Sequence, residues 1–150
     1  MLTAMDIMTA DPVCCTPETS LQEVAQMMVD ADCGALPVTD SSESGTPIGV
    51  ITDRDIVSRA VAQGKDLRVM TASDCMSTPC VTVDVESTLE ECVDVLEGSM
   101  IRRVPVVDED GRCCGIIAQA DIARFGKQRA GELVQQISGG AEAPAGALND

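Results

Sequence analysis

The chain contains no tryptophan, tyrosine or histidine, and its single aromatic residue is Phe125. Its hydrophobic core must therefore be built from aliphatic side chains, with methionine and cysteine as filling residues. Its eight cysteines include no Cys-x-x-Cys pair, and no histidine is present to complete a zinc site. A Ser-His-Asp site, a P-loop and a GxGxxG loop are absent as well. We therefore predict neither a metal site nor a catalytic site.

Positive charge is scarce, because ten lysines and arginines stand against 25 aspartates and glutamates, for a net charge of −15. Binding to nucleic acid requires a basic face that neutralises phosphates, and binding to an anionic membrane requires a polybasic segment. Neither kind of partner is expected here. A single small phosphate ligand remains compatible with this composition, since a few local arginines suffice to hold it.

Long hydrophobic runs are also missing, although 45% of the residues are hydrophobic and suffice for a core. No apolar stretch approaches the roughly 20 residues that a membrane-spanning helix needs. The first residues, MLTAMDIMTADP, lack the basic and apolar regions of a signal peptide. We therefore expect a cytoplasmic protein, in which a framework of disulfides is not expected either.

The sequence contains an internal repeat. A shift of 68 residues places TAMDIM (3–8) on TASDCM (71–76) and LPVTD (36–40) on VPVVD (104–108). After a loop two residues shorter, GVITDRDI (49–56) falls on GIIAQADI (115–122). We predict two repeats, residues 3–62 and 71–127, a linker at 63–70, and a partly mobile C-terminal extension at 128–150.

The same alignment interprets most of the cysteines as small hydrophobic residues. In the other repeat, isoleucine or valine stands at the positions of four of them, Cys15, Cys33, Cys75 and Cys92. This exchange favours packing in the core. The adjacent pairs Cys14–Cys15 and Cys113–Cys114 retain a possible redox role, because an alternating strand turns only one residue of each pair inward.

Each repeat reads as strand, helix, strand, strand, helix. Capping patterns at Ser20 and Thr88 open the first helices, and the segments 36–52 and 104–118 read as hairpins. Second helices are expected at about 53–63 and 119–126, and residues 127–138 suit one further amphipathic helix. One repeat alone, with three strands and two helices, cannot cover both faces of its sheet. We therefore predict an α/β fold in which two β-α-β-β-α repeats pack sheet-to-sheet with pseudo-two-fold symmetry.

An aspartate occurs at the same junction between strand and helix in both repeats, as Asp55 and Asp121. Thr52-x-x-Asp55 is itself a capping pattern, which is a purely structural role. The same geometry also suits a ligand, since a carboxylate can accept the two hydroxyls of a ribose next to a bound phosphate. Ala118 has lost the capping hydroxyl while Asp121 stays, and this favours the ligand hypothesis somewhat without excluding the cap.

The recurring motifs resemble a pair of CBS domains, the cystathionine β-synthase repeat, which together form a Bateman module. The matching segments are DIM and DCM, GALPVTD and RRVPVVD, and GVITDRDI and GIIAQADI, so the resemblance covers about residues 3–126. It implies a stand-alone regulatory module without catalytic activity or a required cofactor, which binds AMP, ADP, ATP or S-adenosylmethionine between the repeats. It also implies a homodimer that signals to an unknown protein partner.

The family's binding residues transfer to two sites, and the base would lie among aliphatic side chains. The first site is implied at Thr52, Arg54, Asp55, Gly34, Ala35, Val83 and Asp84. The second site is implied at Asp121, Arg102, Arg103, Cys15, Thr16 and Pro17. Ala118 departs from the pattern, so phosphate binding at the second site depends on the two arginines. The alternative is a ligand-independent scaffold for dimerisation with vestigial sites.

Overall fold

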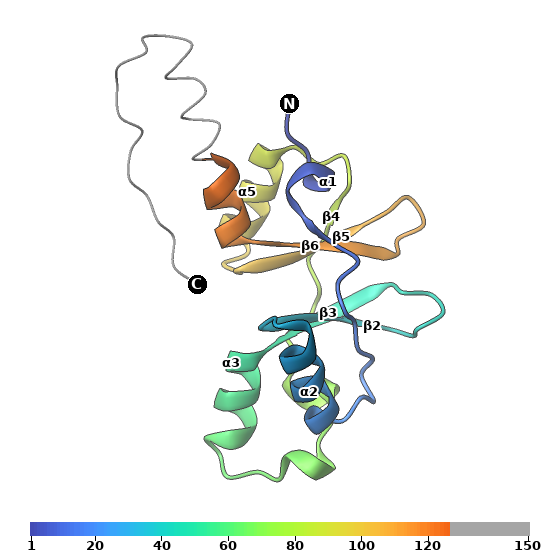
Figure 1. Cartoon of the computed structure of the whole chain (residues 1–150), viewed down its shortest axis with the longest axis vertical. Helices are drawn as coiled ribbons and strands as arrows, with labels where there is room; N and C mark the ends of the chain where they lie inside the picture. The colour runs from blue at the N-terminus through green and yellow to red at the C-terminus, as the bar shows by residue number, and fades with distance from the viewer. Residues whose placement is uncertain (127–150) are drawn as a thin grey trace.

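The computed structural model describes residues 1–126, which form two α/β units stacked on each other (Figure 1). The first unit contains α2 (Leu21–Ala31), β2 (Ala35–Thr39), β3 (Pro47–Thr52), α3 (Asp53–Ile56), a π-helical turn (Val57–Val61), a 3-10 turn (Leu67–Val69) and α4 (Ala72–Cys75). The second contains α1 (Ala4–Ile7), β1 (Thr9–Ala10), β4 (Val83–Asp84), α5 (Leu89–Gly98), β5 (Arg103–Val107), β6 (Cys113–Ala118) and a helix that begins at residue 119. The helix predicted at 127–138 and the extension at 128–150 lie outside the described residues.

The predicted hairpins and capped helices form as expected. β2 pairs antiparallel with β3 so that Ala35 lies opposite Thr52, and β5 pairs with β6 so that Arg103 lies opposite Ala118. Ser20 caps α2 by accepting a hydrogen bond from the Glu23 amide. The two sheets face each other, β2 against β6 and β3 against β5, with the longer helices outside (Figure 1). The predicted α/β fold with sheet-to-sheet packing is confirmed.

The opening segment of each repeat crosses to the unit of the other repeat. β1 pairs with β6, and Ser77 forms the matching antiparallel bridge with Val50 of β3. The helices that precede these segments cross in the same way. Ala4 of α1 is buried in the second core, and Ala72 of α4 is buried in the first. Each packed unit therefore contains the opening segment of the other sequence repeat.

Each unit has its own aliphatic core beneath its sheet. Equivalent residues occupy the two cores, as Ile51 of β3 and Ile117 of β6 show, since both are fully buried. Burial of one such side chain stabilises the fold by about 1.5–3 kcal/mol. Three of the four cysteines predicted to pack in the core are buried, namely Cys15, Cys75 and Cys92. The prediction is wrong for Cys33, which is exposed in the turn after α2.

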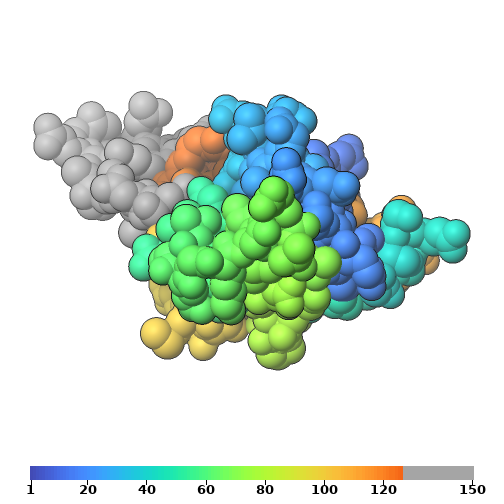
Figure 2. Space-filling model, turned by 90° about the horizontal axis from the view of Figure 1, so that it is seen from below, coloured from blue at the N-terminus to red at the C-terminus, as the bar shows by residue number. Residues whose placement is uncertain are grey.

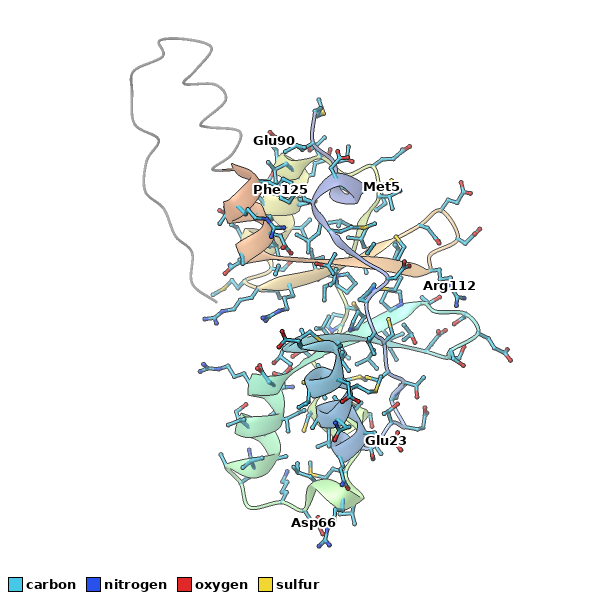
Figure 3. The ribbon with its side chains drawn as sticks, viewed as in Figure 1. Met5, Glu23, Asp66, Glu90, Arg112 and Phe125 are labelled. Atoms are coloured by element: carbon cyan, nitrogen blue, oxygen red, sulfur yellow. The ribbon has the colours of Figure 1, made fainter. Side chains whose placement is uncertain are left out.

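The tips of the two hairpins are joined by hydrogen bonds at one side of the molecule. The Arg112 guanidinium donates hydrogen bonds to the carbonyls of Ser42 and Glu43, and the Cys113 amide donates to the Gly45 carbonyl at 2.8 Å. Gly45 has a φ of +64°, and a Cβ there would lie 2.8 Å from the Arg112 side chain, so glycine suits this contact. Figures 2 and 3 show the two tips projecting together, and Figure 3 shows Arg112 between them.

Within residues 1–126, no helix has the length and apolar character needed to cross a membrane.

A candidate ligand cleft between the two units

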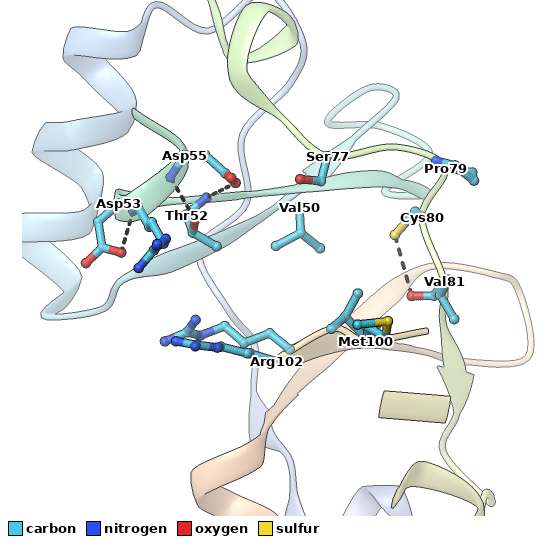
Figure 4. A pocket seen from close by; sticks show the side chains of 13 residues that line it. Val50, Thr52, Asp53, Asp55, Ser77, Pro79, Cys80, Val81, Met100 and Arg102 are labelled. Atoms are coloured by element: carbon cyan, nitrogen blue, oxygen red, sulfur yellow. Dashed lines mark hydrogen bonds between the residues drawn. The ribbon is translucent and has the colours of Figure 1, made fainter. Parts of the chain in front are cut away.

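A cavity of about 590 Å³ lies between the two units, away from the fastened hairpin tips (Figure 4). One wall is the junction of β3 and α3, and the opposite wall is the segment that leads into β5. The crossing segment that follows α4 closes one side. The lining residues are Val50, Thr52, Asp53, Arg54, Asp55, Ser77, Pro79, Cys80, Val81, Met100, Ile101, Arg102 and Arg103.

Thr52 and Asp55 form a reciprocal capping box at the start of α3. The Asp55 amide donates to Thr52 Oγ1 at 3.0 Å, and the Thr52 amide donates to Asp55 Oδ2 at 3.0 Å. In the second repeat the Ala118 amide donates to Asp121 Oδ2 at 2.9 Å, so half of this box survives without the threonine. Capping alone therefore accounts for the aspartate in both repeats, and its repetition is no argument for a ligand.

The capping role leaves Thr52 and Asp55 with further hydrogen-bonding capacity. A threonine hydroxyl that accepts one hydrogen bond still has a proton to donate, and a carboxylate offers about four acceptor positions. Both side chains are among the lining residues of the cavity. The box therefore holds a donor and an acceptor in fixed positions toward the space between the units.

Three arginines line the same cavity from two directions. Arg54 comes from α3, whereas Arg102 and Arg103 come from the opposite unit at the start of β5 (Figure 4). The Arg102 carbonyl accepts a hydrogen bond from the Gln119 amide at 2.9 Å, so its backbone is anchored beside β6. The resemblance grouped Arg102 and Arg103 with Asp121. The structure instead brings them to Thr52 and Asp55.

The other residues implied for the first site do not line this cavity. Gly34 and Ala35 lie beside the junction, since the Gly34 carbonyl accepts from the Asp53 amide at 2.9 Å and Ala35 lies opposite Thr52. Val83 is buried in the second core. The Asp84 carboxylate accepts from the Glu86 amide and so stabilises the turn before α5.

The residues implied for the second site are likewise held in local structure. Cys15 is buried in the first core, and burial raises the pKa of its thiol to about 12. The Thr16 amide donates to Thr19 Oγ1, and the Pro17 carbonyl accepts from the Ser73 amide. Asp121 makes an ion pair of 3.4 Å with Arg124. None of the four lines the cavity that contains the arginines.

Sequence reasoning missed most of the apolar wall, which is formed by Val50, Pro79, Val81, Met100 and Ile101. These residues come from both repeats, and only the crossing of the opening segment brings Pro79 and Val81 next to β3. The repeated motif TASDCM (71–76) ends just before these two residues, and the sequence does not show where they pack. Cys80 lies in the same wall, and burial raises the pKa of its thiol to about 11.

No group of three or more cysteine, aspartate or glutamate side chains is arranged to hold a metal ion in the part of the chain that the structure describes.

Both repeats match the family model of the CBS domain, over residues 4–62 and 72–127. The chain therefore belongs to the CBS-domain family and is a CBS pair. It is 39% identical over 124 residues to hypoxic response protein 1 of Mycobacterium tuberculosis, an alignment that covers 83% of this chain and 85% of that protein. The crystal structure of Hypoxic Response Protein I, with two coordinated zinc ions, has a TM-score of 0.71, 38% identity, and coverage of 83% and 99%.

Two solved CBS pairs with ligands share the same fold. CBSX2 of Arabidopsis thaliana, in complex with AMP, has 26% identity and a TM-score of 0.74, and covers 85% of this chain and 98% of its own. The CBS pair of protein MJ0100, in complex with 5′-methylthioadenosine and S-adenosylmethionine, has 27% identity and a TM-score of 0.75, with coverage of 86% and 98%.

Proposed function

We propose that this chain is a stand-alone regulatory module, without catalytic activity, that binds an adenosine nucleotide in the cleft between its two units. The observation that carries the proposal is the meeting of Thr52 and Asp55 with the arginines of the opposite unit, Arg102 and Arg103, around one cavity. Positive charge is concentrated there in a chain whose net charge is −15. Solved relatives bound to AMP and to S-adenosylmethionine support the choice of an adenosine ligand.

Each part of the nucleotide finds chemically suitable residues in the cleft. The Asp55 carboxylate accepts hydrogen bonds from the hydroxyls of the ribose, and the Thr52 hydroxyl donates a hydrogen bond to a phosphate. The arginines add charge-assisted hydrogen bonds, which are stronger than neutral ones. The apolar wall that includes Val50, Pro79 and Ile101 covers the base, as expected for a ligand pocket whose lining contains no aromatic residue to stack on it.

Ligand binding in this position has a clear regulatory consequence. The walls belong to two units that are also joined at the hairpin tips, so a nucleotide stabilises one arrangement of the units over others. A ligand shifts such an equilibrium only through its different affinity for the two arrangements. A partner protein that recognises one arrangement thereby reads the nucleotide concentration. We expect the module to act as a homodimer, which sedimentation velocity tests directly.

The first test is thermal melting of the purified chain with AMP, ADP, ATP, S-adenosylmethionine or buffer alone. A ligand at one hundred times its Kd stabilises the folded state by about 2.7 kcal/mol. The proposal predicts a dose-dependent rise in Tm with the nucleotides. If no adenosine compound changes the melting curve at millimolar concentration, the proposal is wrong.

The capping geometry favours one alternative, a ligand-independent scaffold. Boxes of the same kind occur at Thr3–Asp6 and Thr71–Asp74, outside the cleft, so the box at Thr52 does not require a ligand. For a scaffold, replacement of Asp55 lowers the stability and nothing else. The same melting experiment therefore separates the two functions.

A further inference from the structure

The internal repeat generates a second position equivalent to the cleft, around Asp121. The backbone framework there is the same. The Gln119 amide donates to the Arg102 carbonyl at 2.9 Å, just as the Asp53 amide donates to the Gly34 carbonyl at 2.9 Å. Asp32 and Met100 occupy equivalent turns with φ values of +51° and +54°. The two positions therefore differ in their side chains rather than in their frame.

The side chains that suit a phosphate occur at one position only. Where the cleft has Thr52, Arg54, Arg102 and Arg103, the second position has Ala118, Ala120, Gly34 and Ala35. Only the aspartate is common to both, as Asp55 and Asp121. The second position has thus lost the hydroxyl donor and all three guanidinium groups.

The charge of the two positions differs in sign as well. The cleft contains three arginines and two aspartates, Asp53 and Asp55. The aligned residues of the second position include Asp11, Asp32 and Asp121 and no arginine. The cation next to Asp121 is Arg124, whose side chain is 68% exposed and lies over the Phe125 ring at 5.1 Å. A phosphate is therefore attracted to the cleft and repelled from its counterpart.

We propose that each chain binds one nucleoside polyphosphate, in the Thr52 cleft only, and that Arg54, Arg102 and Arg103 determine this choice. The inference rests on the proposed function and adds the ligand's charge class and the stoichiometry. Guanidinium groups that enter from both units can contact successive phosphate groups of one bound nucleotide, because each guanidinium binds phosphate oxygens in a bidentate manner. Affinity therefore rises with the number of phosphates, and the uncharged nucleoside and the cationic S-adenosylmethionine bind weakly.

Isothermal titration calorimetry on the full chain tests this inference, with ATP, ADP, AMP, adenosine and S-adenosylmethionine as separate titrants. We expect one ATP per chain, with affinity decreasing from ATP to ADP to AMP to adenosine, and a binding constant that falls with added salt. Two ATP per chain would overturn the inference, and so would equal affinity for adenosine and ATP. Both outcomes would leave the proposed function intact, whereas no binding of any titrant would overturn both.

Matched arginine variants locate the binding. Arg102→Ala is expected to weaken ATP binding about tenfold or more, since a hydrogen bond to a charged group contributes on that scale. Adenosine binding should change much less, because adenosine has no phosphate to contact. Arg124→Ala removes an arginine beside Asp121 and serves as the control, for which we expect unchanged ATP affinity. Equal loss of ATP affinity in the two variants would contradict the assignment.

A gain of function completes the test. Ala118→Thr combined with Ala120→Arg restores two phosphate-binding side chains at the second position, and both sites of substitution are at least partly exposed. We expect a second, weaker ATP to appear in the titration of this variant. A folded variant that still binds a single ATP would show that the missing side chains do not explain the asymmetry.

Discussion

Replacement of the two equivalent aspartates separates their capping role from ligand binding. Asp55→Ala and Asp121→Ala each remove one carboxylate that accepts a backbone amide, at 3.0 Å from Thr52 and at 2.9 Å from Ala118. Loss of such a cap costs about 1 kcal/mol. For a domain of this size that corresponds to a decrease in Tm of roughly 4 °C. We expect similar decreases in the two variants without ligand.

With ATP the two variants should diverge. At one hundred times Kd, ATP adds about 2.7 kcal/mol, or roughly 10 °C, to the wild-type chain. Asp121→Ala should keep this increment in full. Asp55→Ala also loses the ribose contacts, which weakens binding about 10- to 100-fold. At the same ATP concentration its increment then falls to about 0.4–1.4 kcal/mol, or roughly 2–5 °C.

Differential scanning fluorimetry of the wild-type chain and the two variants, with and without ATP, measures these decreases and increments in one experiment. Asp55→Asn is the conservative control, because an amide oxygen still accepts the Thr52 amide and preserves most of the cap. The reasoning fails if Asp55→Ala retains the full ATP increment, or if Asp121→Ala loses as much of it as Asp55→Ala does.

Three further predictions concern the cores, a cleft thiol and the hairpin tips. Ile51→Ala and Ile117→Ala each leave a cavity in one core and should lower the free energy of unfolding in urea by about 3 kcal/mol; a loss below about 1 kcal/mol would contradict the assigned burial. Burial raises the pKa of Cys80 to about 11, so its thiol is protonated at pH 8. Its rate of alkylation, measured by mass spectrometry, should therefore be low at pH 8 and rise about tenfold per pH unit up to pH 10. Alkylation of Cys80 as fast as that of the exposed Cys33 at pH 8 would refute this assignment. Arg112→Ala should accelerate hydrogen exchange of the Cys113 amide while lowering stability by at most about 1 kcal/mol, and unchanged exchange would show that the fastened tips do not depend on the arginine.

The fold was predictable because its signals are local and occur twice. Two hairpin patterns, before Thr52 and before Ala118, and the capping pattern at Ser20 depend on residues close in sequence. The internal repeat showed that the two hairpins are copies of the same structural element. The need to cover both faces of a small sheet then predicted the packing of the sheets. Cys33 shows the limit of this reasoning, since its alignment with Ile101 does not reveal that the turn after α2 is exposed.

The site was predictable only in part, because its two walls come from different repeats. Thr52, Arg54 and Asp55 follow from one local motif, and the structure places them together. The opposite wall depends on a segment that crosses between the units and on how the sheets face each other. Neither is encoded in local sequence. For this reason the sequence did not indicate that Arg102 and Arg103 line the same cavity as Thr52 and Asp55.

A crystal structure of the chain grown with excess ADP tests the central claim most directly. The account predicts one ADP per chain, with its ribose at Asp55, its phosphates between Arg54 and Arg102, and an empty position at Asp121. Density for ADP beside Asp121, or ADP in the cleft with its phosphates turned away from the arginines, would contradict it.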